Sequence, residues 1–252
     1  MFAPWSDLGY LVAAPDPIET TAMRPSPVEG GSWNLVEAAR YALLRRLAPA
    51  FRHGVVGALH PIELIAEAVE RRLQAAVPDL ATARENLGKI TDLSRSAVLS
   101  CTNLTSWLAP EEGAVTMLGE GIDECLALLK TDFGMRGFAV RNEAREIGVD
   151  VSRAALRNVL TASLITATDT APGPAELVLT AELSRGHAVV SILVRPAEDI
   201  TGFADAAFYR RLEWGDVQAL ARAESVELLQ QGDRVSLRYP IAGIPHRGPL
   251  PR

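Results

Sequence analysis

The segment APAFRHGVVGALHPIELIAEAVERRL, residues 48–73, carries apolar side chains at steps of three and four residues. The same spacing starts upstream at Leu35 and continues to Leu73, which predicts about 40 residues of helix. Pro49 and Pro61 interrupt this pattern, because each lacks an amide donor and crowds the preceding helical turn. We therefore expect kinks or a break into two helices, with the break near Pro49.

A second apolar stripe follows the turn AVPDL, residues 76–80, and runs from Leu87 to Leu108 before Pro110 stops it. Two long helices joined by a short turn form a hairpin. Such a hairpin buries only one stripe of each helix, so a second copy would cover the apolar surface that remains. The sequence therefore predicts a homodimer in which two hairpins form a four-helix bundle.

Beyond Gly113 the pattern becomes mixed. Residues 115–137 and 150–171 have helical periodicity, and FAVRNEA, residues 138–144, reads as a short strand. Two alternating runs meet at SRGH, residues 184–187, which indicates a β-hairpin. Residues 203–229 then read as a helix that becomes extended toward its end. The last predicted strand covers residues 233–240. Helices alternating with antiparallel strands predict an α/β sandwich, with helices on one face of the sheet.

The whole chain is thus expected to be an α+β protein with four parts. Residues 1–32, rich in proline, form a flexible N-terminal arm; residues 33–110 form the helical hairpin; residues 111–240 form the α/β domain; residues 241–252 form a tail.

Composition excludes several classes of partner. Of the 252 residues, 48% are hydrophobic and 22% charged, and the formal net charge is −6. Without a long run of Lys or Arg, this charge disfavours general binding to nucleic acid or anionic lipid. The N-terminus lacks a basic region ahead of an apolar stretch, and no apolar run approaches the roughly 18 to 20 residues that span a bilayer. We expect a cytoplasmic protein. Cys101 and Cys125 lack metal-ligand spacing, and no metal site is expected.

The predicted order of elements resembles the catalytic core of a sensor histidine kinase, over about residues 34–240. That core joins a dimerisation and histidine-phosphotransfer hairpin to a Bergerat-type ATPase domain. In RHGVVGALHPI, residues 52–62, His53 stands in the place of the phosphoaccepting histidine. Leu59 and Ile62 then take the positions that face the bundle. The resemblance implies that His53 accepts a phosphoryl group. His60 lies seven residues further on, about 20° away around an ideal helix, so geometry alone does not exclude it.

The motif departs from the kinases beside the histidine itself. Gly54 replaces the acid that readies the histidine for attack on ATP, and Ala58 replaces a proline. A neutral imidazole is nucleophilic near pH 7 without that acid, but the general-base assistance is missing. This loss weakens autokinase activity more than phosphotransfer.

The resemblance also implies that the nucleotide site is lost. In LRNVLTASLITATDTA, residues 156–171, Ala162 and Thr166 stand where the kinases carry asparagines, one of which coordinates magnesium. RPAEDITGFADAAF, residues 195–208, has no Gly-x-Gly turn after its strand, since Asp199 and Gly202 do not form that motif. We expect no nucleotide cofactor and no ATP-dependent kinase activity.

Such a combination resembles bacterial histidine phosphotransferases derived from kinase cores, which relay phosphoryl groups between response-regulator receiver domains. It implies that His53 is the catalytic residue and that the receiver supplies the magnesium. We assign Arg52, Gly54 and Gly57 to the partner-binding surface, because the two glycines leave room around the imidazole and the arginine lies beside it. Close packing within the dimer would also explain the glycines, and solvation the arginine. Two alternatives stay open. One is a catalytically silent pseudokinase that serves as a scaffold or regulatory binding module, and the other is a divergent active kinase.

Overall fold

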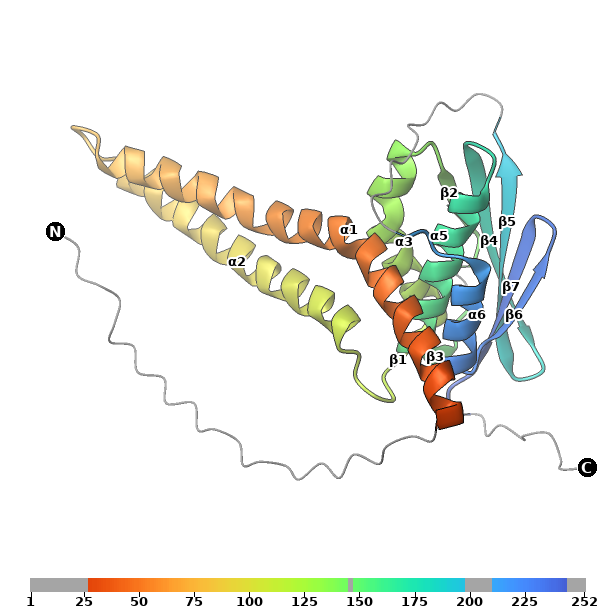
Figure 1. The fold of residues 1–252 in the computed structure, drawn as a ribbon. Coiled ribbons are helices and arrows are strands. Elements are labelled where there is room, and N and C mark those ends of the chain that lie inside the picture. The colour runs from red at the N-terminus through yellow and green to blue at the C-terminus, as the bar shows by residue number, and fades with distance from the viewer. Residues whose placement is uncertain (1–26, 145–146, 198–209, 244–252) are drawn as a thin grey trace, which may run out of the picture.

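The computed structural model describes residues 27–144, 147–197 and 210–243. Helix α1 (Pro27–Leu73) is continuous through both prolines, so the expected break at Pro49 is wrong. Pro49 is exposed, so water can hydrate the carbonyl group that loses its helical donor there. Figure 1 shows that α1 changes direction along its length instead of ending.

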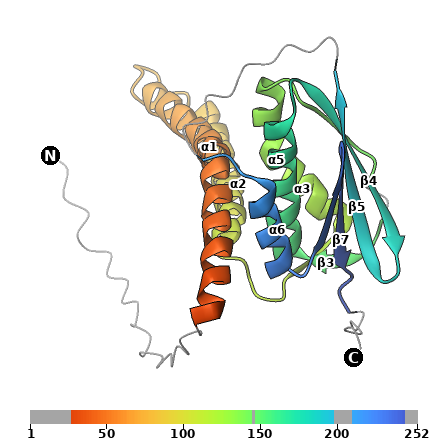
Figure 2. The same cartoon turned by 45° about the vertical axis from the view of Figure 1, so that its right-hand side comes forward.

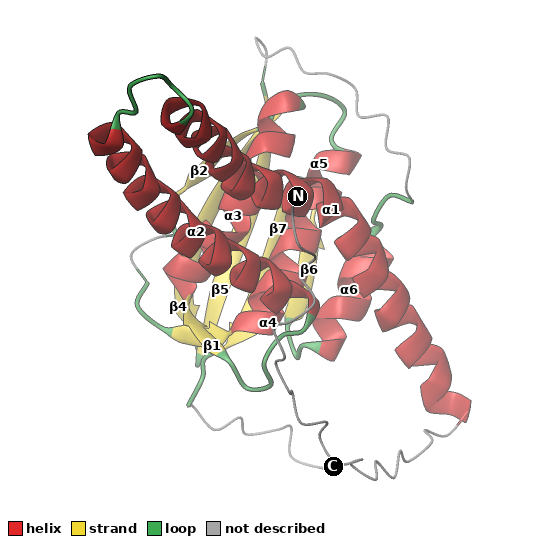
Figure 3. Cartoon of the chain, turned by 90° about the vertical axis from the view of Figure 1, so that its left-hand side faces the viewer, coloured by secondary structure: helices red, strands yellow, loops and turns green. Residues whose placement is uncertain are grey.

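Helix α2 (Leu80–Leu108) completes the predicted hairpin. The Asp79 side chain caps it by accepting a hydrogen bond from the Thr82 amide at 3.0 Å, which satisfies one of the free amides of the first turn. Figure 3, seen from the side of the hairpin, shows α2 running beside α1. Close contacts between the two helices are extensive.

The two halves of α1 have different surroundings. Its first half packs against helices α3 (Leu118–Met135) and α6 (Trp214–Ala223), and Ala39, Leu43 and Leu47 are buried there in the main hydrophobic core. Its second half leaves that core and runs with α2 away from the sheet (Figure 1). One helix thus belongs to both parts of the molecule.

The main sheet has five strands in the order β2-β4-β5-β7-β6. Strand β2 pairs with β4 in parallel, and the other neighbours are antiparallel. The predicted β4–β5 hairpin turns at Arg185 and Gly186, which have φ angles of 48° and 79°, as a tight two-residue turn requires. The strands are β2 (Ala139–Asn142), β4 (Ala175–Ser184), β5 (His187–Pro196), β6 (Glu227–Gln231) and β7 (Arg234–Pro240).

Helices cover one face of this sheet, as predicted. Three consecutive segments form the central cover: α4 (Arg153–Ala155), the π-helix η1 (Leu156–Leu160) and α5 (Thr161–Thr170). Ser152 caps them by accepting from the Ala155 amide at 3.2 Å. Figure 2 shows α3, α5 and α6 between the sheet and α1. The chain is therefore an α+β protein in which a helical hairpin precedes a sheet layered by helices.

A short second sheet was not predicted. Strands β1 (Val115–Met117) and β3 (Asp150–Ser152) pair antiparallel. Residues 1–26 of the expected arm lie outside the described residues, and α1 begins at Pro27. In the described ranges no helix is both long and apolar enough to cross a membrane.

Candidate functional site

His53 lies on the second half of α1, just after the helix leaves the core, and its side chain is exposed. The Phe51 ring contacts Trp107 of α2, with ring centroids 6.1 Å apart. Each residue advances an α-helix by about 100°, so His53 projects about 160° away from Phe51. The imidazole therefore points away from α2 and is open to an approaching molecule.

The residues around His53 differ in what they face. Arg52 is exposed beside it. A Cβ atom added to Gly57 would meet no atom within 4 Å, whereas one added to Gly54 would lie 3.6 Å from Leu104 Cδ1 of α2. Arg52 and Gly57 therefore border His53 on the open surface, and Gly54 borders it on the side of α2.

His60 has a different environment. Its Nδ1 lies 3.5 Å from Glu63 Oε2, one turn further along α1. Both side chains are exposed. Within the described part of the chain, His60 has this acidic neighbour and no ion pair involves His53.

One flank of the hairpin is apolar and uncovered. Three shallow hollows adjoin here: one of about 340 Å³ shares Leu59 and Ile62 with one of about 410 Å³, and shares Val98 with one of about 600 Å³. Leu59 is 48% exposed and Val98 is 65% exposed, which is unusual for apolar residues on adjacent helices. We call this surface the apolar flank; it comprises Val56, Leu59, Ile62, Ile90, Ala97, Val98, Leu99 and Cys101.

The two α5 positions that the resemblance assigned to asparagines face the core. Ala162 and Thr166 are fully buried, and the Thr166 hydroxyl has no hydrogen-bond partner. A methyl group offers no ligand to magnesium, and an enclosed hydroxyl is not open to an ion that keeps most of its water. The described residues also contain no cluster of three or more His, Cys, Asp or Glu side chains able to hold a metal. These residues do not fit a magnesium nucleotide.

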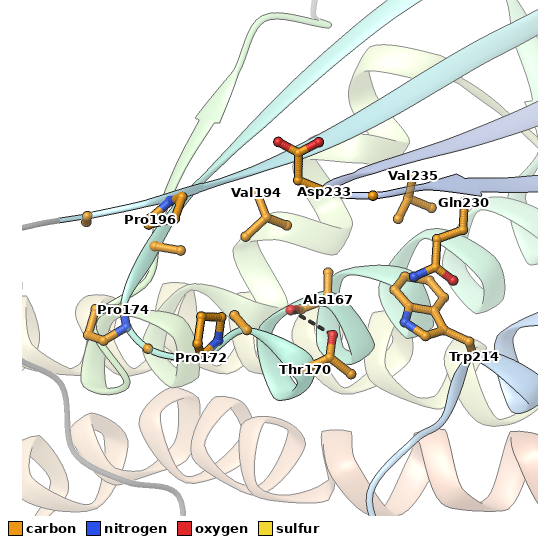
Figure 4. A pocket seen from close by; sticks show the side chains of 15 residues that line it. Ala167, Thr170, Pro172, Pro174, Val194, Pro196, Trp214, Gln230, Asp233 and Val235 are labelled. Carbon is orange, nitrogen blue, oxygen red and sulfur yellow. Dashed lines mark hydrogen bonds between the residues drawn. The ribbon is translucent and has the colours of Figure 1, made fainter.

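A pocket of about 630 Å³ lies between the end of α5, the sheet and Trp214 (Figure 4). Its described lining is mainly apolar and includes Pro172, Val194 and Val235 but no Lys, Arg or His. The Thr170 hydroxyl donates back to the carbonyl oxygens of its own helix. Because a triphosphate needs cationic or amide donors, this lining does not suit one.

Arg157 of η1 is a residue that the sequence analysis missed. It is buried, and its guanidinium donates to both carboxylate oxygens of Glu124 on α3 and to the Ser106 carbonyl and hydroxyl oxygens on α2. It also lies over the Trp107 ring, 4.8 Å from the centroid. The sequence could have indicated this residue, because it is a single Arg within an otherwise apolar helical pattern.

A second buried ionic cluster attaches α1. Asp169, at the end of α5, bonds Arg46 of α1 at 3.0 Å and Arg136 at 2.8 Å. All three side chains are at least 89% buried. The hairpin is thus fixed to the α/β part through both of its helices, through Arg46 on α1 and through Ser106 and Trp107 on α2.

No family model and no curated protein sequence matches this chain. Solved structures that align with it include the Acinetobacter baumannii histidine kinase AdeS, at 11% identity over 76% of this chain and 98% of that one, with a TM-score of 0.40. A histidine kinase from Burkholderia phymatum STM815 aligns at 16% identity over 77% and 96%, with a TM-score of 0.37. The Erythrobacter litoralis EL346 blue-light activated histidine kinase aligns at 16% over 71% and 63%, with a TM-score of 0.39. Scores this low carry no inference about activity.

Proposed function

We propose that this chain is a phosphorelay histidine phosphotransferase of two-component signalling, with His53 as its phosphoacceptor. The observation that carries the proposal is the exposed imidazole of His53, which points away from α2. A receiver domain has to bring its aspartyl phosphate directly to the histidine. Only an unobstructed imidazole on a rigid element can accept such a partner.

The chain supplies the nucleophile of the reaction, and the receiver supplies the phosphoryl group and the magnesium. A neutral ring nitrogen of His53 attacks the phosphorus of the receiver's aspartyl phosphate. The P–N bond forms while the P–O bond to the aspartate breaks, and the carboxylate leaves with the bonding electrons. The reverse exchange loads a second receiver. Magnesium held by the receiver would neutralise charge on the phosphoryl oxygens in both steps.

The surface around His53 suits this partner. Arg52 places a guanidinium next to the imidazole, where it can pair with phosphoryl oxygens or with an acidic receiver surface. Gly57 leaves open space on the same face, and Gly54 keeps the α2 side free of a side chain. We assign these three residues to partner binding.

The apolar flank supports a homodimer. Its residues Val56, Leu59, Val98 and Leu99 are exposed on the hairpin, and a second hairpin packed against them would form a four-helix bundle. We place this dimer in the cytoplasm, where receiver domains act. The buried Ala162 and Thr166 support the view that the α/β part does not hold ATP.

The decisive experiment exposes the protein to radiolabelled phospho-receiver domains of the same organism. We expect an acid-labile, base-stable label on the wild type and on His60→Ala, and no label on His53→Ala. A wild type that takes no label from any receiver would contradict phosphotransfer and favour the silent binding module.

A separate titration tests the remaining alternative. We expect no ATP binding at micromolar concentration, with or without magnesium. Micromolar affinity would contradict the loss of the nucleotide site and would support a divergent kinase.

A further inference from the structure

Arg157 is a buried cation with an unusually complete set of partners. Its side chain is 5% exposed and pairs with Glu124, which is 24% exposed. The Ser106 carbonyl and hydroxyl oxygens each accept from Nη1 at 3.0 Å. Burial of an ion pair rarely adds stability beyond what apolar side chains of equal volume would give. The stability of the core therefore does not explain why this position carries Arg.

The partners of Arg157 lie on different parts of the molecule. Glu124 belongs to α3 in the α/β part, whereas Ser106 and Trp107 belong to the last turn of the hairpin helix α2. Arg157 itself lies in a π-helix, a local widening that is frequent at functional sites. One side chain thus joins the base of the hairpin to the layer of helices on the sheet.

The contact continues from Trp107 to the segment that carries His53. Trp107 lies between the Arg157 guanidinium and the Phe51 ring, at centroid distances of 4.8 and 6.1 Å. Phe51 is two residues before His53 on the same helix. Any movement of Arg157 relative to α2 would therefore shift the part of α1 that presents the imidazole.

We propose that Arg157 is a positioning residue for phosphotransfer. Through Trp107 and Phe51 it fixes the hairpin around His53 at one angle to the α/β part, so that a receiver meets both surfaces in a single geometry. This inference rests on the proposed function. This positioning role requires the planar guanidinium of Arg157. Only Arg can donate to a carboxylate and to a carbonyl group while it stacks on an indole ring.

The test compares Arg157→Lys with Arg153→Lys. Lys keeps the charge but loses the fork and the stacking. Arg153 lies 3.5 Å from the same Glu124, whereas the Ser106 and Trp107 contacts are made by Arg157, which makes Arg153 a matched control. Two phosphoryl donors are used: the receiver that labels the wild type best, and potassium phosphoramidate, a small donor that needs no docking.

We expect Arg157→Lys to lower kcat/KM with the phospho-receiver about tenfold or more, since a small misplacement of reacting groups has an effect of this size. The rate with phosphoramidate should stay at the wild-type value, because the imidazole itself is unchanged. Arg153→Lys should match the wild type with both donors. Wild-type transfer from the receiver to Arg157→Lys would overturn the proposal, as would an equal loss with both donors.

A second readout keeps the two proposals separable. Hydrogen exchange of the amides in residues 50–57 should accelerate in Arg157→Lys and not in Arg153→Lys. If no receiver labels the wild type, the proposed function fails, while this exchange still tests the coupling. If Arg157→Lys does not fold, Trp107→Leu interrupts the same path and leaves the ion pair with Glu124 intact. Unchanged exchange in a folded variant would overturn the inference.

Discussion

The two halves of α1 follow the same helical periodicity and end in opposite environments. In the first half Leu43 and Leu47 are each 1% exposed, whereas in the second half Val56 and Leu59 are 56% and 48% exposed. Among the described residues, the first half packs against α3 and α6, and the second half runs with α2 away from the sheet (Figure 1). Periodicity therefore identifies which residues share a face, but it does not say whether this chain or a second molecule covers that face.

The largest effect should come from the ionic cluster that attaches the first half of α1. Asp169→Ala removes the carboxylate that Arg46 and Arg136 share, while Arg136 keeps its ion pair with Asp132. The loss of this buried partner should lower the free energy of unfolding by about 3 kcal/mol. The matched control on the hairpin is Asp92→Ala. Asp92 pairs with Arg95 at 3.4 Å, and both are exposed, so its loss should change stability by less than about 1 kcal/mol. Urea unfolding measures the change in free energy of unfolding for both variants. Equal changes would contradict the view that the first half of α1 is held more firmly than the hairpin.

The next largest difference should come from shortening one leucine in each half of α1. Leu47→Ala should lower the free energy of unfolding by about 2–5 kcal/mol, because it leaves a cavity in the core. Leu59→Ala removes the same atoms from the apolar flank, where the monomer leaves them half in water. It should instead raise the dimer dissociation constant, measured by sedimentation equilibrium. A concentration-independent loss of stability in Leu59→Ala, as large as that of Leu47→Ala, would show that the flank is internal.

The two cysteines give the finest comparison, one from each region. Burial raises the pKa of the Cys125 thiol to about 12, while Cys101 on the hairpin is half-buried. In the native protein at pH 8, Ellman's reagent should modify Cys101 and leave Cys125 intact. Cys101 lines the apolar flank, so its rate should fall as protein concentration rises. A rate independent of concentration would contradict the dimer.

The burial of Cys125 also determines how the free energy of unfolding changes at alkaline pH. Above pH 9 the unfolded chain loses the Cys125 proton first, so stability should fall as pH rises toward the folded-state value. The slope is at most about 1.4 kcal/mol per pH unit for one group. Burial raises the pKa of Tyr239 in the same direction. Cys125→Ala should flatten this fall, as measured by urea unfolding at pH 8 and pH 10.

Much of this architecture follows from local sequence patterns. The hairpin, the helices over the sheet and the tight turn at Arg185 and Gly186 all follow from periodicity and turn chemistry. The exposure of His53 also follows, because it lies off the stripe that contains Phe51 and Val55. Its role remains a prediction.

What could not be predicted depends on contacts between distant segments. The three-residue strands β1 and β3 pair Val115 with Ser152, and neither carries enough pattern to be recognised alone. The helix continues through Pro49 because packing on both sides holds it, an effect that local propensity does not contain. Arg157 finds its partners on α2 and α3, so its burial depends on the arrangement of three helices.

The continuity of α1 also bears on how such a chain can be divided. A cut in the connection between α2 and β1 would not yield two intact pieces. The C-terminal piece would lose the side chains that cover α6, and the N-terminal piece would carry Ala39, Leu43 and Leu47 into water. Exchange of the hairpin between related proteins would therefore have to carry a matching α/β part with it.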